Sequence, residues 1–145
     1  MLRAHIDISR GLDGEAVVLA CFDLGEDELA ASAHAVAAAA AERYRTAAMT
    51  SDDVLGLREL TTLTDELRDL ALRAGLRTVV LRPARLAAYR DAVAFFVESR
   101  DAAEWRRAED LEPLALVRGL LGPLEDLSAD ALRAALTGSL EPRSC

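Results

Sequence analysis

The sequence predicts an α+β domain: a small antiparallel sheet of about three strands, covered by four to five helices and built from two tandem β-α-α repeats. Three patterns predict this. Apolar and polar residues alternate near the N-terminus, leucines recur three and four apart in mid-chain, and a shift of 57 residues aligns one half with the other. We expect one domain over residues 1–138 and a flexible tail over 139–145.

The N-terminal residues predict a β-hairpin. In residues 4–9, Ile6 and Ile8 fall on one side and polar residues on the other, which is typical of a half-buried strand. Asp13-Gly14 is a favoured tight-turn pair, and the β-rich, apolar residues 16–24 follow it. The first strand, residues 4–9, is an addition that precedes the repeats.

The first repeat continues with two helices. Three consecutive acids after Gly25 complement a helix dipole, and the Ala-rich segment carries that helix to about Met49. Residues 50–53 interrupt it and supply a new N-cap, and Gly75 stands where the glycine after a helix belongs. The inner stripe of the second helix is Val54, Leu57, Leu60, Leu63, Leu67 and Leu70.

The second repeat follows the same order. Residues 77–83 predict a strand, Pro83 opens a helix that runs to about Arg107, and its buried stripe is Leu86, Tyr89, Val93, Phe96 and Val97. A further helix begins at Glu109, and its inner residues are Leu111, Leu114, Val117, Leu120 and Leu121. Gly122-Pro123 should kink or end it, and Ser128 should cap a short last helix that stops near Gly138.

The repeat itself is visible without a gap. Between residues 24–70 and 81–127, fourteen of 47 matched positions are identical, against about five expected from a composition this rich in Ala and Leu. The units span about 17–75 and 76–134, and we expect them to pack about a pseudo-twofold axis, as the subunits of a dimer do.

The strand register predicts which side chains share a sheet face. Phe22 and Leu24 match Val79 and Leu81, so these four should lie on one face. The opposite face is also apolar, with Val17, Leu19, Cys21, Thr78 and Val80. Either helices cover both faces or a second subunit covers one, and we expect a homodimer. The free edge of the third strand is another candidate contact.

Composition and charge exclude several classes. The net charge of −8 repels nucleic acid, and no apolar run is long enough to span a membrane. The first nine residues lack the apolar region of a signal peptide, so we expect a cytoplasmic protein. All 17 basic residues are arginines, and this composition is typical of a GC-rich bacterial genome.

No catalytic motif stands out, and we expect no catalytic residue. His5 beside Asp7 could orient a general base, but an exposed pair on a strand explains it better. His34 falls at the boundary between the buried and exposed sides of its helix. Cys21 fits a buried small residue better than a nucleophile paired with either histidine.

No metal site or cofactor is expected either. The consecutive acids at 26–28 spread around a helix and cannot converge. Asp53 and Asp110 are matched by the repeat and could meet in a carboxylate cage, but both are more simply interpreted as helix caps.

The large aromatics of the second repeat suggest a binding surface. Phe95 and Phe96 match alanines of the first repeat, which favours complementary core packing but also allows a groove floored by alanines and walled by aromatics. The candidate ligand- or partner-binding residues are Phe95, Trp105, Arg106 and Arg107.

We therefore expect a non-enzymatic interaction module, homodimeric, that binds another protein through this aromatic and arginine surface. One alternative is an acidic inhibitor of a basic partner, of the immunity-protein or antitoxin kind. Another is a small-molecule-binding protein with a cleft between the repeats. The least favoured alternative is a hydrolase or isomerase that uses His5, Cys21 or the acids.

Overall fold

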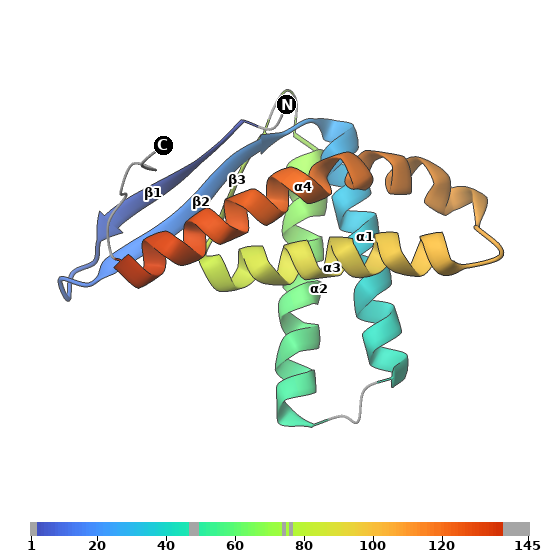
Figure 1. Ribbon diagram of the computed structural model, residues 1–145, viewed down its shortest axis with the longest axis horizontal. Helices are drawn as coiled ribbons and strands as arrows, with labels where there is room; N and C mark the ends of the chain where they lie inside the picture. Colours follow the sequence, from blue (N-terminus) through green and yellow to red (C-terminus); the bar gives the residue numbers. More distant parts are fainter. Residues whose placement is uncertain (1–2, 47–49, 74, 76, 138–145) are drawn as a thin grey trace.

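The structure is a computed structural model that describes residues 3–46, 50–73, 75 and 77–137 (Figure 1). Over these residues it is α+β, as predicted, with a three-stranded antiparallel sheet and four helices. The predicted tail, residues 139–145, lies outside the described part. The elements in order are β1 (Ala4–Arg10), β2 (Ala16–Leu24), α1 (Glu26–Thr46), α2 (Ser51–Ala71), β3 (Arg77–Leu81), α3 (Pro83–Ala102) and α4 (Ala108–Thr137).

The sheet has the order β1-β2-β3, and both pairs are antiparallel. The predicted hairpin is confirmed: the chain reverses between β1 and β2 through Gly14, whose φ of 81° is a left-handed value that glycine adopts without strain. In the β2–β3 pair, Phe22 lies opposite Val79 and Ala20 opposite Leu81. The predicted register is therefore correct, and these side chains share the face that meets the helices.

The helices form two antiparallel pairs on one side of the sheet. Figure 1 shows α1 and α2 running away from the sheet, with α3 and α4 lying across them and α4 following the strands. The inward face of the sheet is buried, including Phe22 and Leu81 at 1% and 4% exposure. Against it pack the predicted α3 residues Leu86, Tyr89, Val93, Phe96 and Val97, all buried.

The opposite sheet face is only partly covered in the described residues: Glu59 of α2 lines a pocket together with Leu19 and Val80, and Cys21 is 8% exposed. We call it the open sheet face, defined by the outward side chains His5, Asp7, Val17, Leu19, Cys21, Thr78 and Val80. Val80 is half exposed, at 50%, and Val17 and Leu19 are partly buried. The described helices therefore leave part of this face, including half of the Val80 side chain, in contact with solvent.

The start of α2 is fixed by a capping box. The Thr50 hydroxyl accepts a hydrogen bond from the Asp53 amide, and the Asp53 carboxylate accepts from the Thr50 amide at 3.1 Å. Asp53 is therefore a cap residue, as predicted, and the box satisfies two donors that a helix terminus would leave open.

Helix α3 is shorter than predicted. It ends at Ala102 rather than near Arg107, so Trp105, Arg106 and Arg107 lie in the segment between α3 and α4. The end of α1 is described to Thr46, and residues 47–49, over which the prediction extended it, lie outside the described residues.

Helix α4 is longer than predicted and unbroken. It continues through Gly122-Pro123 to Thr137, and Ser128 is a buried residue within it rather than a cap. Leu120, Leu124 and Leu127 are buried on both sides of the proline, so packing along the whole stripe outweighs the lost backbone hydrogen bond.

Three smaller predictions about helix faces and ends were wrong. Leu111 is exposed, at 53%, because it stands one position off the buried stripe, whereas Leu121 is partly buried and packs against the core as predicted. Val54 near the free end of α2 is 39% exposed. Gly75, with φ 87°, turns the chain toward β3 beyond the C-cap at Leu72 and is not the residue directly after that cap.

None of the helices in the described part of the chain combines the length and apolarity that a membrane crossing requires.

Candidate functional site

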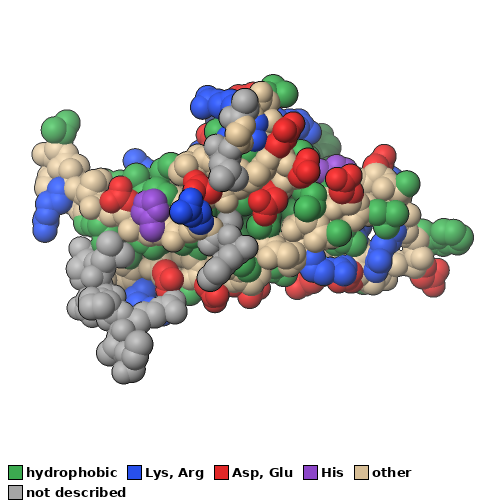
Figure 2. Space-filling view, turned by 90° about the horizontal axis from the view of Figure 1, so that it is seen from above, with side chains coloured by type: hydrophobic (Ala, Val, Ile, Leu, Met, Phe, Trp, Pro, Cys, Tyr) green, Lys and Arg blue, Asp and Glu red, His purple; other side chains and the backbone are tan. Residues whose placement is uncertain are grey.

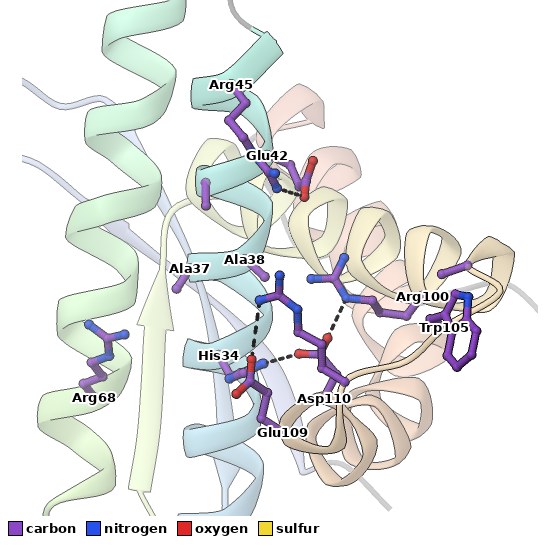
Figure 3. Close-up of a pocket in the computed structure, with 13 residues that line it drawn as sticks. His34, Ala37, Ala38, Glu42, Arg45, Arg68, Arg100, Trp105, Glu109 and Asp110 are labelled. Atoms are coloured by element: carbon purple, nitrogen blue, oxygen red, sulfur yellow. Dashed lines mark hydrogen bonds and ion pairs between the residues drawn. The ribbon is translucent and has the colours of Figure 1, made fainter.

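A recess of about 480 Å³ opens between α1, the segment that joins α3 to α4, and the flank of α2. We call it the recess. Its principal lining residues are His34, Ala37, Ala38, Arg68, Arg100, Trp105, Arg107 and Asp110 (Figure 3). A volume of this size lies within the usual range of about 300–1,000 Å³ for ligand pockets.

The floor of the recess consists of small side chains. Ala37, Ala38 and Ala41 line it from successive turns of α1. Alanine is the strongest helix former, so the sequence can keep a stable helix here without filling the space beside it. Of the two alanines that match Phe95 and Phe96, Ala38 lines the recess and Ala39 is buried in the core.

Asp110 is the buried centre of one wall. It is 4% exposed, and its two carboxylate oxygens are used separately: Oδ1 accepts from His34 Nε2 at 2.7 Å, and Oδ2 accepts from Arg100 Nε at 2.9 Å. Burial alone would raise the pKa of this carboxyl, but the two hydrogen bonds and the positive charges outweigh it and lower the pKa from its ordinary value. Asp110 is therefore ionised at neutral pH.

The partners of Asp110 are themselves fixed by Phe96. The Arg100 guanidinium lies 4.9 Å from the Phe96 ring centre, and the His34 ring meets the same phenyl ring edge-on at 5.8 Å. These contacts hold three side chains from α1, α3 and α4 in one arrangement (Figure 3). The result is an oriented imidazole at the edge of the recess, beside a carboxylate whose charge Arg100 balances.

The other arginines of the recess differ in how firmly they are paired. Arg45 pairs with Glu42 on its own helix. Arg107 Nη1 lies 3.6 Å from Glu109 Oε1, and both side chains are largely exposed. Arg68 has no carboxylate within ion-pair distance among the described residues, although it lines the recess from α2.

Two of the four predicted binding residues line the recess. Trp105 is 88% exposed, and it stands beside the recess together with Arg107. Arg106 instead donates to the Arg100 carbonyl at 3.1 Å and lies 3.5 Å from Asp101, and Phe95, at 42% exposure on α3, is not among the lining residues.

The sequence analysis missed the ion-paired cluster of His34, Arg100 and Asp110. It interpreted Asp110 as a helix cap, but this carboxylate is turned toward His34 and Arg100. His34 and Asp110 are 76 positions apart, so no local spacing relates them. The available signal was the repeat, in which both Arg100 and Asp110 are identical to their matched residues.

The remaining chemical candidates lie on the open sheet face. His5 stands directly opposite Cys21 in the β1–β2 pair. Burial, with the nearby charges of Asp7 and Asp23, raises the pKa of the Cys21 thiol, which disfavours the thiolate that a nucleophile requires. Among the described residues, no three His, Cys, Asp or Glu side chains gather as a metal site would need.

Comparisons of the chain with protein-family models, with curated proteins and with solved structures find no match.

Proposed function

We propose that this protein is a non-enzymatic interaction module that binds another protein through Trp105, Arg107 and the adjoining recess. The observation that carries the proposal is the indole of Trp105, which is 88% exposed at the mouth of a recess with a floor of alanines. Exposed Trp and Arg side chains beside a concave surface are the groups most enriched at the energetic centres of protein interfaces.

The acidic-inhibitor alternative has less support. An inhibitor that shields a basic partner would present its acids together, so that they face the partner's positive charges. Figure 2 shows the acidic side chains scattered over the face seen from above, with arginines among them. The small-molecule alternative keeps one specific observation in its favour, which is the recess volume of about 480 Å³.

The proposal includes the two tandem β-α-α repeats. In support, α1 and α3 begin at residues 26 and 83, and α2 and α4 begin at 51 and 108, so each pair is offset by 57 residues. Two matched pairs also touch each other: Phe22 lies opposite Val79 in the sheet, and Ser32 Oγ shares a hydrogen bond with Tyr89 Oη. Matched residues that meet are expected only where a pseudo-twofold axis passes between them.

Most residues that line the recess from the first repeat are not repeated at the matching positions of the second repeat. The residue that matches Ala38 of the floor is Phe95, and the residue that matches His34 is Asp91. A phenyl ring at the floor position would occupy the space that the alanine leaves. The proposed binding surface is therefore specific to one end of the molecule.

A homodimer also belongs to the proposal, through the open sheet face. Val17, Leu19 and Val80 form an apolar strip there that remains partly exposed. A second copy, packed with the same face inward, would remove this strip from water. This contact is separate from the recess, so each can be tested alone.

The test uses Trp105→Ala and a matched control, Leu136→Ala, which removes another largely exposed apolar side chain, 80% exposed, far along α4. Proteins captured from the native host by the wild type are quantified against both variants. A partner retained by Leu136→Ala and lost by Trp105→Ala supports the proposal. If every captured protein is retained by Trp105→Ala, the Trp105 surface is not the binding site.

Binding to the isolated partner can then be read from the protein itself. Trp105 is the only tryptophan in the chain, so its fluorescence reports on this surface alone. Ala38→Phe, which copies the matched residue of the second repeat into the floor, should block the recess without removing Trp105. We expect a fluorescence change on binding in the wild type and its loss in Ala38→Phe.

A further inference from the structure

We propose that the recess binds an oxyanion, a carboxylate or phosphate group, between Arg68 and Arg107. This inference deepens the proposed function by naming the group that a partner or ligand presents to the recess, and it rests on that function only in placing binding there. The protein carries a net charge of −8, so a site for an anion requires local positive charge that its own acids do not cancel.

Arg68 supplies such a charge. It stands on α2 across the recess from His34, and no described carboxylate lies within ion-pair distance of it (Figure 3). An arginine that lines a concave surface without a carboxylate partner keeps its five N–H donors available to a ligand, in a planar fork that suits carboxylate and phosphate oxygens.

Arg107 can supply a second guanidinium at little cost. Its contact with Glu109 is 3.6 Å long, and the two side chains are 82% and 65% exposed. Exposed ion pairs of this kind contribute at most about 1 kcal/mol. An oxyanion that accepts two hydrogen bonds from Arg107 therefore competes readily with Glu109.

Two of the three acids that line the recess, Glu42 and Asp110, have their charges balanced by other residues, which limits their repulsion of an anion. Asp110 accepts from both His34 and Arg100, and Glu42 pairs with Arg45. The lining thus contains four arginines against Glu42, Glu109 and Asp110. The unbalanced charge belongs to Arg68, in a molecule that is otherwise strongly acidic.

The alanine floor leaves room for the ligand. Ala37 and Ala38 stand on α1, which runs between Arg68 on α2 and Asp110 in the close-up view (Figure 3), and they end at Cβ. A carboxylate or phosphate group could therefore approach Arg68 over these methyl groups without displacing a side chain. The adjacent Trp105 remains free to contact the apolar part of the same ligand or partner.

The test uses the ring signals of His34, which lies in the recess and is one of only two histidines. A His5→Gln background leaves His34 as the single histidine to observe by NMR. The probes are inorganic phosphate and succinate, titrated separately at constant pH and ionic strength. We expect both to shift the His34 signals saturably.

The variant is Arg68→Met, and its control is Arg58→Met, the same substitution on the same helix outside the recess. A lost charge-assisted interaction should weaken binding by about tenfold or more in Arg68→Met and leave Arg58→Met unchanged. Arg68→Lys, which keeps the charge but not the fork, should fall between wild type and Arg68→Met. The fold of each variant is checked by its melting temperature, because Arg68 is exposed and its loss should not unfold the chain.

Phosphate binding about tenfold tighter than succinate would identify a phosphate-bearing ligand, and comparable binding would identify the carboxylates of an acidic segment. Shifts that do not saturate, or equal affinities of Arg68→Met and wild type, would overturn the inference. The two proposals fail separately. If a partner depends on Trp105 but neither anion binds, the interaction module stands without the oxyanion site. If the anions bind but no partner depends on Trp105, the oxyanion site stands without the interaction module.

Discussion

The hydrogen bond between Ser32 and Tyr89 offers the sharpest test of the packing, because it joins two buried residues 57 positions apart at the centre of the core. Both side chains are fully buried. Tyr89→Phe removes one hydroxyl and leaves Ser32 without its tertiary partner, while Ser32→Ala does the same to the Tyr89 phenol. The double variant removes both polar groups and leaves nothing unsatisfied.

The expected magnitudes differ between the single variants. Ser32 can turn its hydroxyl back to a carbonyl of its own helix, so Tyr89→Phe should cost only about 1 kcal/mol. The phenol of Tyr89 has no such local alternative, so Ser32→Ala should cost about 2 kcal/mol. The double variant should cost less than the sum by about 1–2 kcal/mol, since a buried pair replaced by apolar groups is nearly neutral.

Equilibrium urea unfolding of the wild type, both single variants and the double variant measures these costs. For a chain of 145 residues, 1 kcal/mol corresponds to about 3 °C in melting temperature, so Ser32→Ala should melt about 6 °C lower. Tyr44→Phe is the control, because Tyr44 is 65% exposed on α1 and the loss of its hydroxyl should cost little. Additive single effects, within about 0.3 kcal/mol, would refute the coupling of the two hydroxyls.

Three further predictions concern separate elements. Asp110 has a lowered pKa, so its ionisation stabilises the fold above the ordinary carboxyl pKa, and that stability is lost as the pH falls through the native pKa. Asp110→Asn should therefore lower the unfolding free energy by about 2–3 kcal/mol at neutral pH and by less in acid. An equal loss at both pH values, measured by urea unfolding, would contradict this. Thr50→Ala removes the hydroxyl of the capping box and should cost about 1 kcal/mol, and an unchanged melting temperature would show that the box contributes nothing. Val80→Asp places a charge on the open sheet face and should convert a dimer to a monomer in size-exclusion chromatography with light scattering; a wild type that elutes as a monomer would remove the dimer proposal.

The sheet was predictable because its signals are local. The alternation in residues 4–9, the Asp13-Gly14 turn and the β-rich residues on either side of it determine a hairpin with one possible register of apolar side chains. The face shared by β2 and β3 side chains followed from the sequence match at an offset of 57, since the matching residues Phe22 and Val79 lie opposite each other. Both inferences depend on short-range pattern and sequence comparison, not on how helices pack.

The ends of α3 and α4 were not predictable from local signals. Gly122-Pro123 is an ordinary helix-ending pair, and no nearby residue shows that α4 continues. The deciding contribution is tertiary: Leu124, Leu127 and Ala131 beyond the proline are buried in the core, at 5% exposure or less. Burial of such residues is worth more than the hydrogen bond that proline removes, but sequence alone does not say what they would meet.

The ion-paired cluster of the recess gives Asp110 a role that differs from that of Asp53, 57 positions earlier in the sequence. Asp53 and Asp110 occupy matched positions, and Asp53 completes a capping box with Thr50. The residue that matches Thr50 is Arg107, which has no hydroxyl to take the other half of the box. Without that partner, the Asp110 carboxylate is available to His34 and Arg100. The departure of Arg107 from the capping pattern is thus one sequence signal that separates the two aspartates, and the same residue lines the recess.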